Sequence, residues 1–128
     1  MKILKVGIDI HGVIDAFPEK FKLLSLALIN DGAEVHIITG IKRSRSIDLM
    51  LDKAGIKFTH FFSIVDYLEA TDQSVEWKNE LPYADKETWN NAKRNYCQRM
   101  NIDLMIDDSS VYRDTFNDID TTYLHVTN

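Results

Sequence analysis

The stretch VGIDIHGVID, residues 6–15, runs from a short apolar segment into a group of polar residues. Valine and isoleucine before Asp9 are typical of a buried strand, which the polar residues then end. A carboxylate at the end of a strand can form a turn, cap a helix or take part in chemistry. The remainder of the chain is needed to decide among these roles.

Strand-like and helix-like segments alternate after this stretch. The helical pattern after Pro18 ends at Asn30-Asp31-Gly32, and the helix from about Ser44 is expected to bury Ile47, Leu51 and Ala54. We expect strands at residues 3–9, 34–40, 56–62, 102–107 and 121–126, and helices at 18–30, 44–54, 87–100 and 110–117. Residues 63–85 read as a less regular stretch. This alternation predicts an α/β fold, a three-layer αβα sandwich with a mostly parallel, Rossmann-like sheet of about five strands.

Length and composition are those of a single globular domain over residues 1–128. Apolar residues make up 45% and charged residues 27% of the 128. The net charge of −5 disfavours broad binding to nucleic acid, although a local basic patch is not excluded. A lone Cys97 favours a reducing compartment, and the apolar runs are too short for a membrane span or a signal peptide. A cytoplasmic protein is therefore expected.

Small polar and acidic residues follow three of the predicted strands. Asp9 follows the first strand, Thr39 the second, and Asp107 and Asp108 the fourth. Each has an ordinary explanation as a turn or helix cap. Their common position at the carboxyl ends of parallel strands, where α/β folds bind ligands, favours a shared site instead.

These polar residues belong to short motifs whose order along the chain resembles that of the haloacid dehalogenase-like (HAD) hydrolases. Members carry Asp-x-Asp-Gly after the first strand, Ser or Thr after the second, then a Lys, then an acidic pair. The corresponding segments here are DIHGV at 9–13, IITG at 37–40, a lysine near the 87–100 helix, and IDDS at 106–109. The resemblance covers most of the chain and implies the family's fold, without room for a separate cap domain.

The resemblance implies a Mg²⁺-dependent phosphatase that works through an aspartyl-phosphate. Asp9 corresponds to the nucleophile, and the ion would be held by Asp9, the backbone carbonyl of His11, and Asp108. Asp107 would orient ligands or waters around it. The residues expected to bind the transferring phosphoryl group are Thr39, Gly40 and a lysine.

Two positions leave the resemblance incomplete. His11 stands where family phosphatases have the acid that protonates the leaving oxygen, and histidine as a residue type can exchange protons near neutral pH. The lysine is either Lys93, inside the predicted helix, or Lys86, at its start; the run into the fourth strand favours Lys93.

Alternatives to a phosphatase remain at this stage. A protein with the same fold that binds phosphate or metal without turnover is compatible with His11. A phospho-acceptor receiver domain would place its acidic pair after the first strand, so the chain order disfavours it. The substrate is expected to be a phosphorylated small molecule or the phosphorylated end of a macromolecule, and neither this choice nor the oligomeric state follows from the sequence.

Several aromatic and histidine residues can be interpreted either as structural or as part of a functional site. Trp77 and Tyr83 lie in the irregular stretch and could line a pocket, although packing is the default expectation. His36, His60 and His125 fall in predicted strands without a metal-ligand spacing, so we expect structural roles for them.

Overall fold

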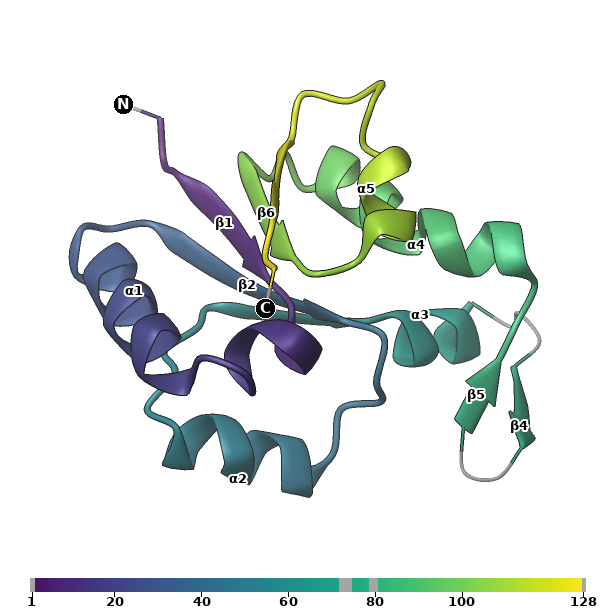
Figure 1. Cartoon of the computed structure of the whole chain (residues 1–128), viewed down its shortest axis with the longest axis horizontal. Helices are drawn as coiled ribbons and strands as arrows, with labels where there is room; N and C mark the ends of the chain where they lie inside the picture. The colour runs from purple at the N-terminus through teal and green to yellow at the C-terminus, as the bar shows by residue number, and fades with distance from the viewer. Residues whose placement is uncertain (1, 72–74, 79–80, 128) are drawn as a thin grey trace.

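The computed structural model describes residues 2–71, 75–78 and 81–127. Five parallel strands form its central sheet in the order β3-β2-β1-β6-β7 (Figure 1). The strands are β1 (Lys5–Ile8), β2 (Glu34–Thr39), β3 (His60–Ser63), β6 (Leu104–Asp107) and β7 (Thr122–His125). The predicted α/β fold with a parallel, Rossmann-like sheet is confirmed.

Helices cover both faces of this sheet (Figure 1). The helices are α1 (Pro18–Asn30), α2 (Arg45–Lys53), α3 (Ile64–Ala70), α4 (Lys86–Arg99) and α5 (Ser110–Asp114). Phe21 of α1 and Leu51 of α2 belong to one buried cluster, and Leu68 of α3 and Cys97 of α4 to the other. The two clusters lie on opposite faces of the sheet, which makes the fold three layers deep.

The side chains of β2 alternate between the two faces of the sheet, so this strand packs against both helical layers. Val35 and Ile37 belong to the first cluster, whereas Ile38 packs in the second. Successive side chains of a strand point to opposite faces, so His36 shares the α4 side with Ile38. A central strand buried on both faces reads as a nearly continuous apolar run, as this one does.

The predicted helices form where their end signals lie. Pro18 opens α1, and the Ser44 hydroxyl accepts a hydrogen bond from the Ile47 N–H at the start of α2. Leu51 is fully buried, while Ile47 and Ala54 are partly buried against the same cluster. The bounds of α4 and α5 agree with the predicted ranges to within a few residues.

The third strand is shorter than predicted because a side chain replaces part of its pairing. We expected it to begin at Ile56, but β3 begins at His60. The Thr59 hydroxyl accepts from the Val35 N–H at 3.1 Å and donates to the Val35 carbonyl at 3.0 Å. The Thr59 N–H also donates to that carbonyl, at 2.8 Å, so the hydroxyl stands in for a backbone partner only at the Val35 N–H.

The stretch expected to be irregular contains a helix and a hairpin. The Ser63 hydroxyl accepts from the Asp66 N–H and starts α3, which buries Ile64, Val65 and Leu68. Strands β4 (Glu76–Lys78) and β5 (Leu81–Tyr83) pair with each other in an antiparallel ribbon apart from the main sheet (Figure 1). Within the described ranges, no helix is long and apolar enough to cross a membrane.

Candidate functional site

The turn after β1 places Asp9 at the carboxyl edge of the sheet. Its N–H donates to the Ile106 carbonyl at 3.0 Å, which ties it to the neighbouring strand β6. The following turn, η1 (Ile10–Ile14), contains Gly12 with a φ of 77°. A Cβ at Gly12 would collide with the Asp108 carboxylate, so glycine allows this backbone to lie against that acid.

Lys93 projects from α4 into the same edge and meets two of the acids. Its ammonium lies 2.8 Å from Asp107 Oδ2 and 3.2 Å from Asp9 Oδ1. The side chain is only 1% exposed, and the ammonium also sits over the Tyr112 ring, 4.7 Å from its centroid. Lys86, the alternative considered from sequence, is exposed at the start of α4. The structure thus brings Lys93 to the carboxylates.

The acids outnumber the cation at this edge. Asp9, Asp107 and Asp108 each contribute a carboxylate oxygen to a group within 4.8 Å, and Lys93 is the one cation that contacts them among the described residues. Burial raises the pKa of Asp9 to about 7, with repulsion from Asp107 adding to it and attraction to Lys93 opposing it. Burial and the neighbouring Asp107 also raise the pKa of Asp108.

Lys93 keeps its charge in this environment. Burial alone would lower the pKa of Lys93, but the carboxylates of Asp9 and Asp107 outweigh it and raise the pKa above its ordinary value. A buried, charged lysine between two acids neutralises only part of their charge. The remaining negative charge is suited to binding a cation.

Asp107 and Asp108 have different surroundings despite being adjacent. Asp107 is fully buried; its Oδ2 accepts from Lys93, and its Oδ1 accepts from the N–H groups of Asp108 and Ser109 at 2.8 and 3.3 Å. These bonds fix the loop that carries Asp108. Oxygen donors of this kind suit Mg²⁺, so the residues present fit that ion.

Thr39 and Gly40 complete the edge at the end of β2. Thr39 is 1% exposed, and its hydroxyl accepts from the Ile41 N–H at 3.4 Å. Both residues line a pocket of about 490 Å³ together with Asp9, Lys93 and Asp108. The residues predicted from strand ends and from α4 therefore share one pocket.

His11 lines this pocket and is held by a residue that the sequence analysis missed. Asp15 accepts from His11 Nδ1 at 2.9 Å and from the Gly12 N–H at 2.7 Å. A carboxylate can only accept, so His11 Nδ1 is the donor in this bond, and Asp15 fixes the orientation of the ring. The spacing of four residues in HGVID was the signal available for this pair.

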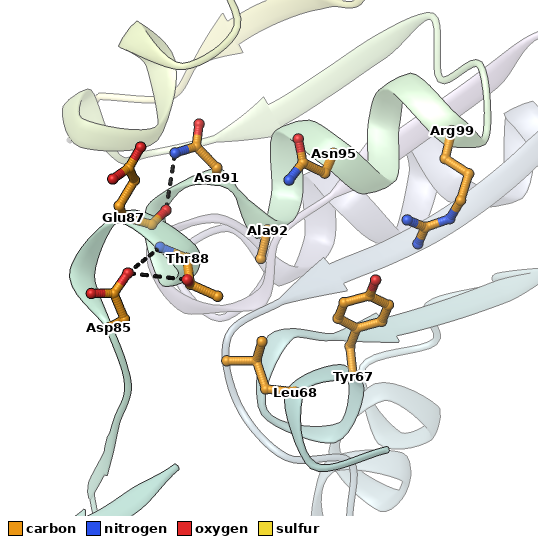
Figure 2. A pocket seen from close by; sticks show the side chains of 9 residues that line it. All are labelled: Tyr67, Leu68, Asp85, Glu87, Thr88, Asn91, Ala92, Asn95 and Arg99. Atoms are coloured by element: carbon orange, nitrogen blue, oxygen red, sulfur yellow. Dashed lines mark hydrogen bonds between the residues drawn. The ribbon is translucent and has the colours of Figure 1, made fainter. Parts of the chain in front are cut away.

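A second hollow, of about 510 Å³, lies along α4 and faces α3 (Figure 2). Its polar groups serve the helix itself: the Thr88 N–H and hydroxyl both donate to Asp85, and the Asn91 amide donates to the Glu87 carbonyl (Figure 2). The two bonds to Asp85 cap the first turn of α4, and the Asn91 bond lies within the helix. These polar groups of the hollow therefore have structural partners in α4 itself.

A histidine cluster lies at the opposite, amino end of the strands. The pairing of β2 with β3 places His36 beside His60, and one ligand atom each of Glu34, His36 and His60 lies within 4.8 Å of the others. These residues have no metal-ligand spacing along the chain, because the pairing of the strands brings them together. The two rings are stacked at 4.1 Å with planes 5° apart, so their in-plane nitrogen lone pairs do not converge on one point.

The nitrogens of His36 already have partners. Nδ1 lies 2.7 Å from the Tyr96 hydroxyl and Nε2 lies 2.8 Å from Glu34. A neutral ring that donates from Nε2 and accepts from Tyr96 satisfies all three groups. His125 Nε2 likewise lies 2.9 Å from the Asp108 carbonyl, where it can donate.

Comparison of the chain with protein-family models, with curated proteins and with solved structures finds no match. We therefore infer the function from the geometry of the site.

Proposed function

We propose that the chain is a Mg²⁺-dependent phosphohydrolase of the HAD type, which hydrolyses a phosphate monoester through an aspartyl-phosphate. The observation that carries the proposal is the contact of Asp9 with Lys93 among three clustered carboxylates. A nucleophilic carboxylate, a buried cation and an excess of oxygen ligands are the groups that phosphoryl transfer needs.

The proposed metal ligands are Asp9, Asp108 and the backbone carbonyl of His11. Asp107 is assigned a positioning role, because both of its oxygens already accept hydrogen bonds from Lys93 and the loop. A bound Mg²⁺ would neutralise charge on the acids and on the phosphoryl oxygens. Gly12 supports this assignment, since its lack of a side chain lets the turn approach Asp108.

The proposed reaction has two steps at phosphorus. In the first, an Asp9 oxygen forms a bond to phosphorus as the bond to the leaving oxygen breaks, and that oxygen takes a proton from His11. In the second, a water oxygen forms a bond to phosphorus and gives a proton to His11, while the bond from phosphorus to the Asp9 oxygen breaks, which releases phosphate and restores the Asp9 carboxylate. Lys93 and the Thr39 hydroxyl would bind phosphoryl oxygens throughout, and Asp15 would orient the His11 ring.

The first experiment measures hydrolysis of an aryl phosphate with Mg²⁺. We expect turnover that EDTA removes and that Asp9→Asn abolishes, because an amide is a poor nucleophile and a poor metal ligand. Asp52→Asn is the matched control, since Asp52 is exposed on α2 and does not line the pocket. Activity of Asp9→Asn within about tenfold of wild type would contradict the role of Asp9 as nucleophile.

The second experiment tests His11 and separates an enzyme from a protein that only binds phosphate. His11→Ala should slow hydrolysis of an alkyl phosphate by about 10²–10⁴-fold and affect an aryl phosphate less, because a good leaving group needs little protonation. His11→Asp should keep metal binding, since the backbone carbonyl is unchanged. Equal rates of hydrolysis for all three proteins on both substrates would show that His11 carries no proton, whereas no hydrolysis by any of them would favour the non-catalytic alternative.

A further inference from the structure

The pocket has two chemically different walls. One carries the carboxylates and Lys93, whereas the other is formed by Tyr83 of β5, Trp89 of α4 and Tyr112 of α5, with Ile41 and Pro82 beside them. Phosphoryl transfer uses only the first wall. The aromatic wall comes from three separate elements, and apart from the contact of Tyr112 with Lys93 the proposed reaction assigns it no role.

Helix α4 contributes a side chain to each of the two walls. Trp89 precedes Lys93 by four residues on α4, so both side chains lie on one face, about one turn or 5.4 Å apart along the axis. Lys93 reaches Asp9, where the phosphoryl group is proposed to bind. The same face of α4 therefore carries an aromatic ring and the cation of the proposed phosphoryl site into one pocket.

Neighbouring groups hold the indole of Trp89 in place. Its Nε1–H donates to the Tyr112 hydroxyl at 2.7 Å. A Cβ added at Gly40 would lie 3.1 Å from Trp89 Cζ2, so the glycine after Thr39 leaves room for the ring. The aromatic wall is thus fixed to the same β2 edge that carries Thr39.

Packing alone accounts for only part of this wall. Trp89 also packs against the buried cluster on the α4 face, which explains an aromatic residue there. Tyr83 is 49% exposed at the pocket and does not belong to either cluster. Exposed aromatic surface beside a polar site is typical of ligand pockets that recognise a ring.

We propose that this pocket accepts phosphate monoesters whose leaving group carries a planar aromatic ring, with nucleoside monophosphates as the chemical class. The phosphate would lie at Asp9 and Lys93, and the base would stack against the wall formed by Tyr83, Trp89 and Tyr112. This inference rests on the proposed phosphohydrolase function. A sugar phosphate without a base would leave the aromatic wall uncovered.

Steady-state kinetics with adenosine 5′-monophosphate and ribose 5-phosphate test the preference. We expect kcat/KM to be about tenfold or more higher for the nucleotide, the size of one base–aromatic stacking contact. Tyr83→Ala should reduce this ratio. Trp77→Ala is the matched control, because Trp77 lies on the partner strand of the same hairpin, is also 49% exposed and is outside the residues that line the pocket.

A binding measurement provides a readout that does not depend on turnover. The chain has two tryptophans, so Trp77→Phe leaves Trp89 as the only one. Adenosine 5′-monophosphate should quench its fluorescence with saturation, and ribose 5-phosphate should not. Tyr83→Ala in this background should weaken the quenching.

The outcomes separate this inference from the function on which it rests. Equal or better hydrolysis of ribose 5-phosphate, with activity still lost in Asp9→Asn, would overturn the aromatic preference and leave the phosphohydrolase intact. No hydrolysis of any phosphate ester would overturn the enzyme. In that case saturable quenching by the nucleotide would still support an aromatic ligand site, and its absence would overturn that as well.

Discussion

The two ends of the central strands carry polar clusters that differ in how their charges are balanced. At the carboxyl end, Asp9, Asp107 and Asp108 meet one lysine. At the amino end, His36 is enclosed between the Tyr96 hydroxyl and Glu34, with both ring nitrogens in hydrogen bonds. The first cluster has excess charge and a pocket, whereas the second has a hydrogen-bond partner for each nitrogen of His36.

The pKa shifts follow the same division. Burial among like charges raises the pKa of Asp9 to about 7, so the folded protein disfavours its ionised form. The hydrogen bond from His36 instead lowers the pKa of Glu34, so its ionised form is favoured. Burial lowers the pKa of His36 and keeps the ring neutral. The comparison indicates that the amino-end cluster stabilises the fold, while the carboxyl-end cluster holds more carboxylates than Lys93 can balance.

Removing Lys93 should have the largest effect on stability. Lys93→Met leaves Asp9 and Asp107 buried without their cation, and we expect a loss of about 3–5 kcal/mol in the free energy of unfolding at pH 7. Urea unfolding measures it. Lys86→Met, at an exposed position of the same helix, should change stability by less than about 0.5 kcal/mol. Equal losses in the two variants would show that the ion pairs of Lys93 do not balance the carboxyl end.

The free energy of unfolding, measured over a series of pH values in EDTA, should show the effect of the unbalanced charge. Asp9 has a higher pKa in the folded protein than in the unfolded chain, so its contribution to stability is complete below about pH 4 and is lost as the pH rises towards 7. Wild type should therefore lose up to about 1.4 kcal/mol per pH unit relative to Asp9→Asn over this interval. Parallel curves for the two proteins would contradict the raised pKa, and Asp52→Asn controls for the change of residue type.

A smaller effect is expected at the amino end. The raised pKa of Tyr96, about 12, keeps its hydroxyl protonated as the donor to His36. Tyr96→Phe leaves that buried nitrogen without the donor and should destabilise the protein by about 1–3 kcal/mol. Turnover should stay within about twofold of wild type, because the cluster is at the far end of the strands. Tyr83→Phe, at an exposed ring, is the stability control.

The smallest change tests whether the amino-end cluster binds metal. His60→Ala removes the ring stacked on His36 and should cost about 0.5–1 kcal/mol, the size of one cross-strand pair. The rise in melting temperature on adding Mg²⁺ should be the same as in wild type and should be absent in Asp9→Asn. A Mg²⁺ effect that disappears in His60→Ala would reverse the assignment of the two clusters.

Much of the carboxyl-end cluster could be predicted from sequence. Asp9, Thr39 and Asp107 each follow an apolar segment, and parallel strands bring such positions to one edge without any knowledge of side-chain contacts. The prediction of Lys93 over Lys86 came instead from the resemblance to the HAD hydrolases. The strand-end residues needed only local patterns and the order of elements.

The features that were missed depend on pairing between distant segments. His36 and His60 become neighbours through the register of two strands, which the sequence does not state. Thr59 shortens β3 by bonding to Val35 across the sheet. The aromatic wall combines Tyr83, Trp89 and Tyr112 from elements that meet only in the fold. In contrast, α3 had local signals, a capping serine at Ser63 and the spacing of Ile64 and Leu68, that the expectation of an irregular stretch overlooked.

The spacing of residues along α4 limits where the chain can tolerate insertions and deletions. Trp89, Lys93 and Tyr96 follow one another at intervals of four and three residues, and together they serve the pocket and the amino-end cluster. One residue inserted between Trp89 and Lys93 would rotate everything after it by about 100° relative to Trp89 and separate the lysine from its acids. An insertion between β4 and β5, which pair only with each other in the described sheets, would leave that spacing unchanged. Gains and losses of residues are therefore expected in the hairpin rather than in the helix, which would let the rim of the pocket diversify while the phosphate end stays constant.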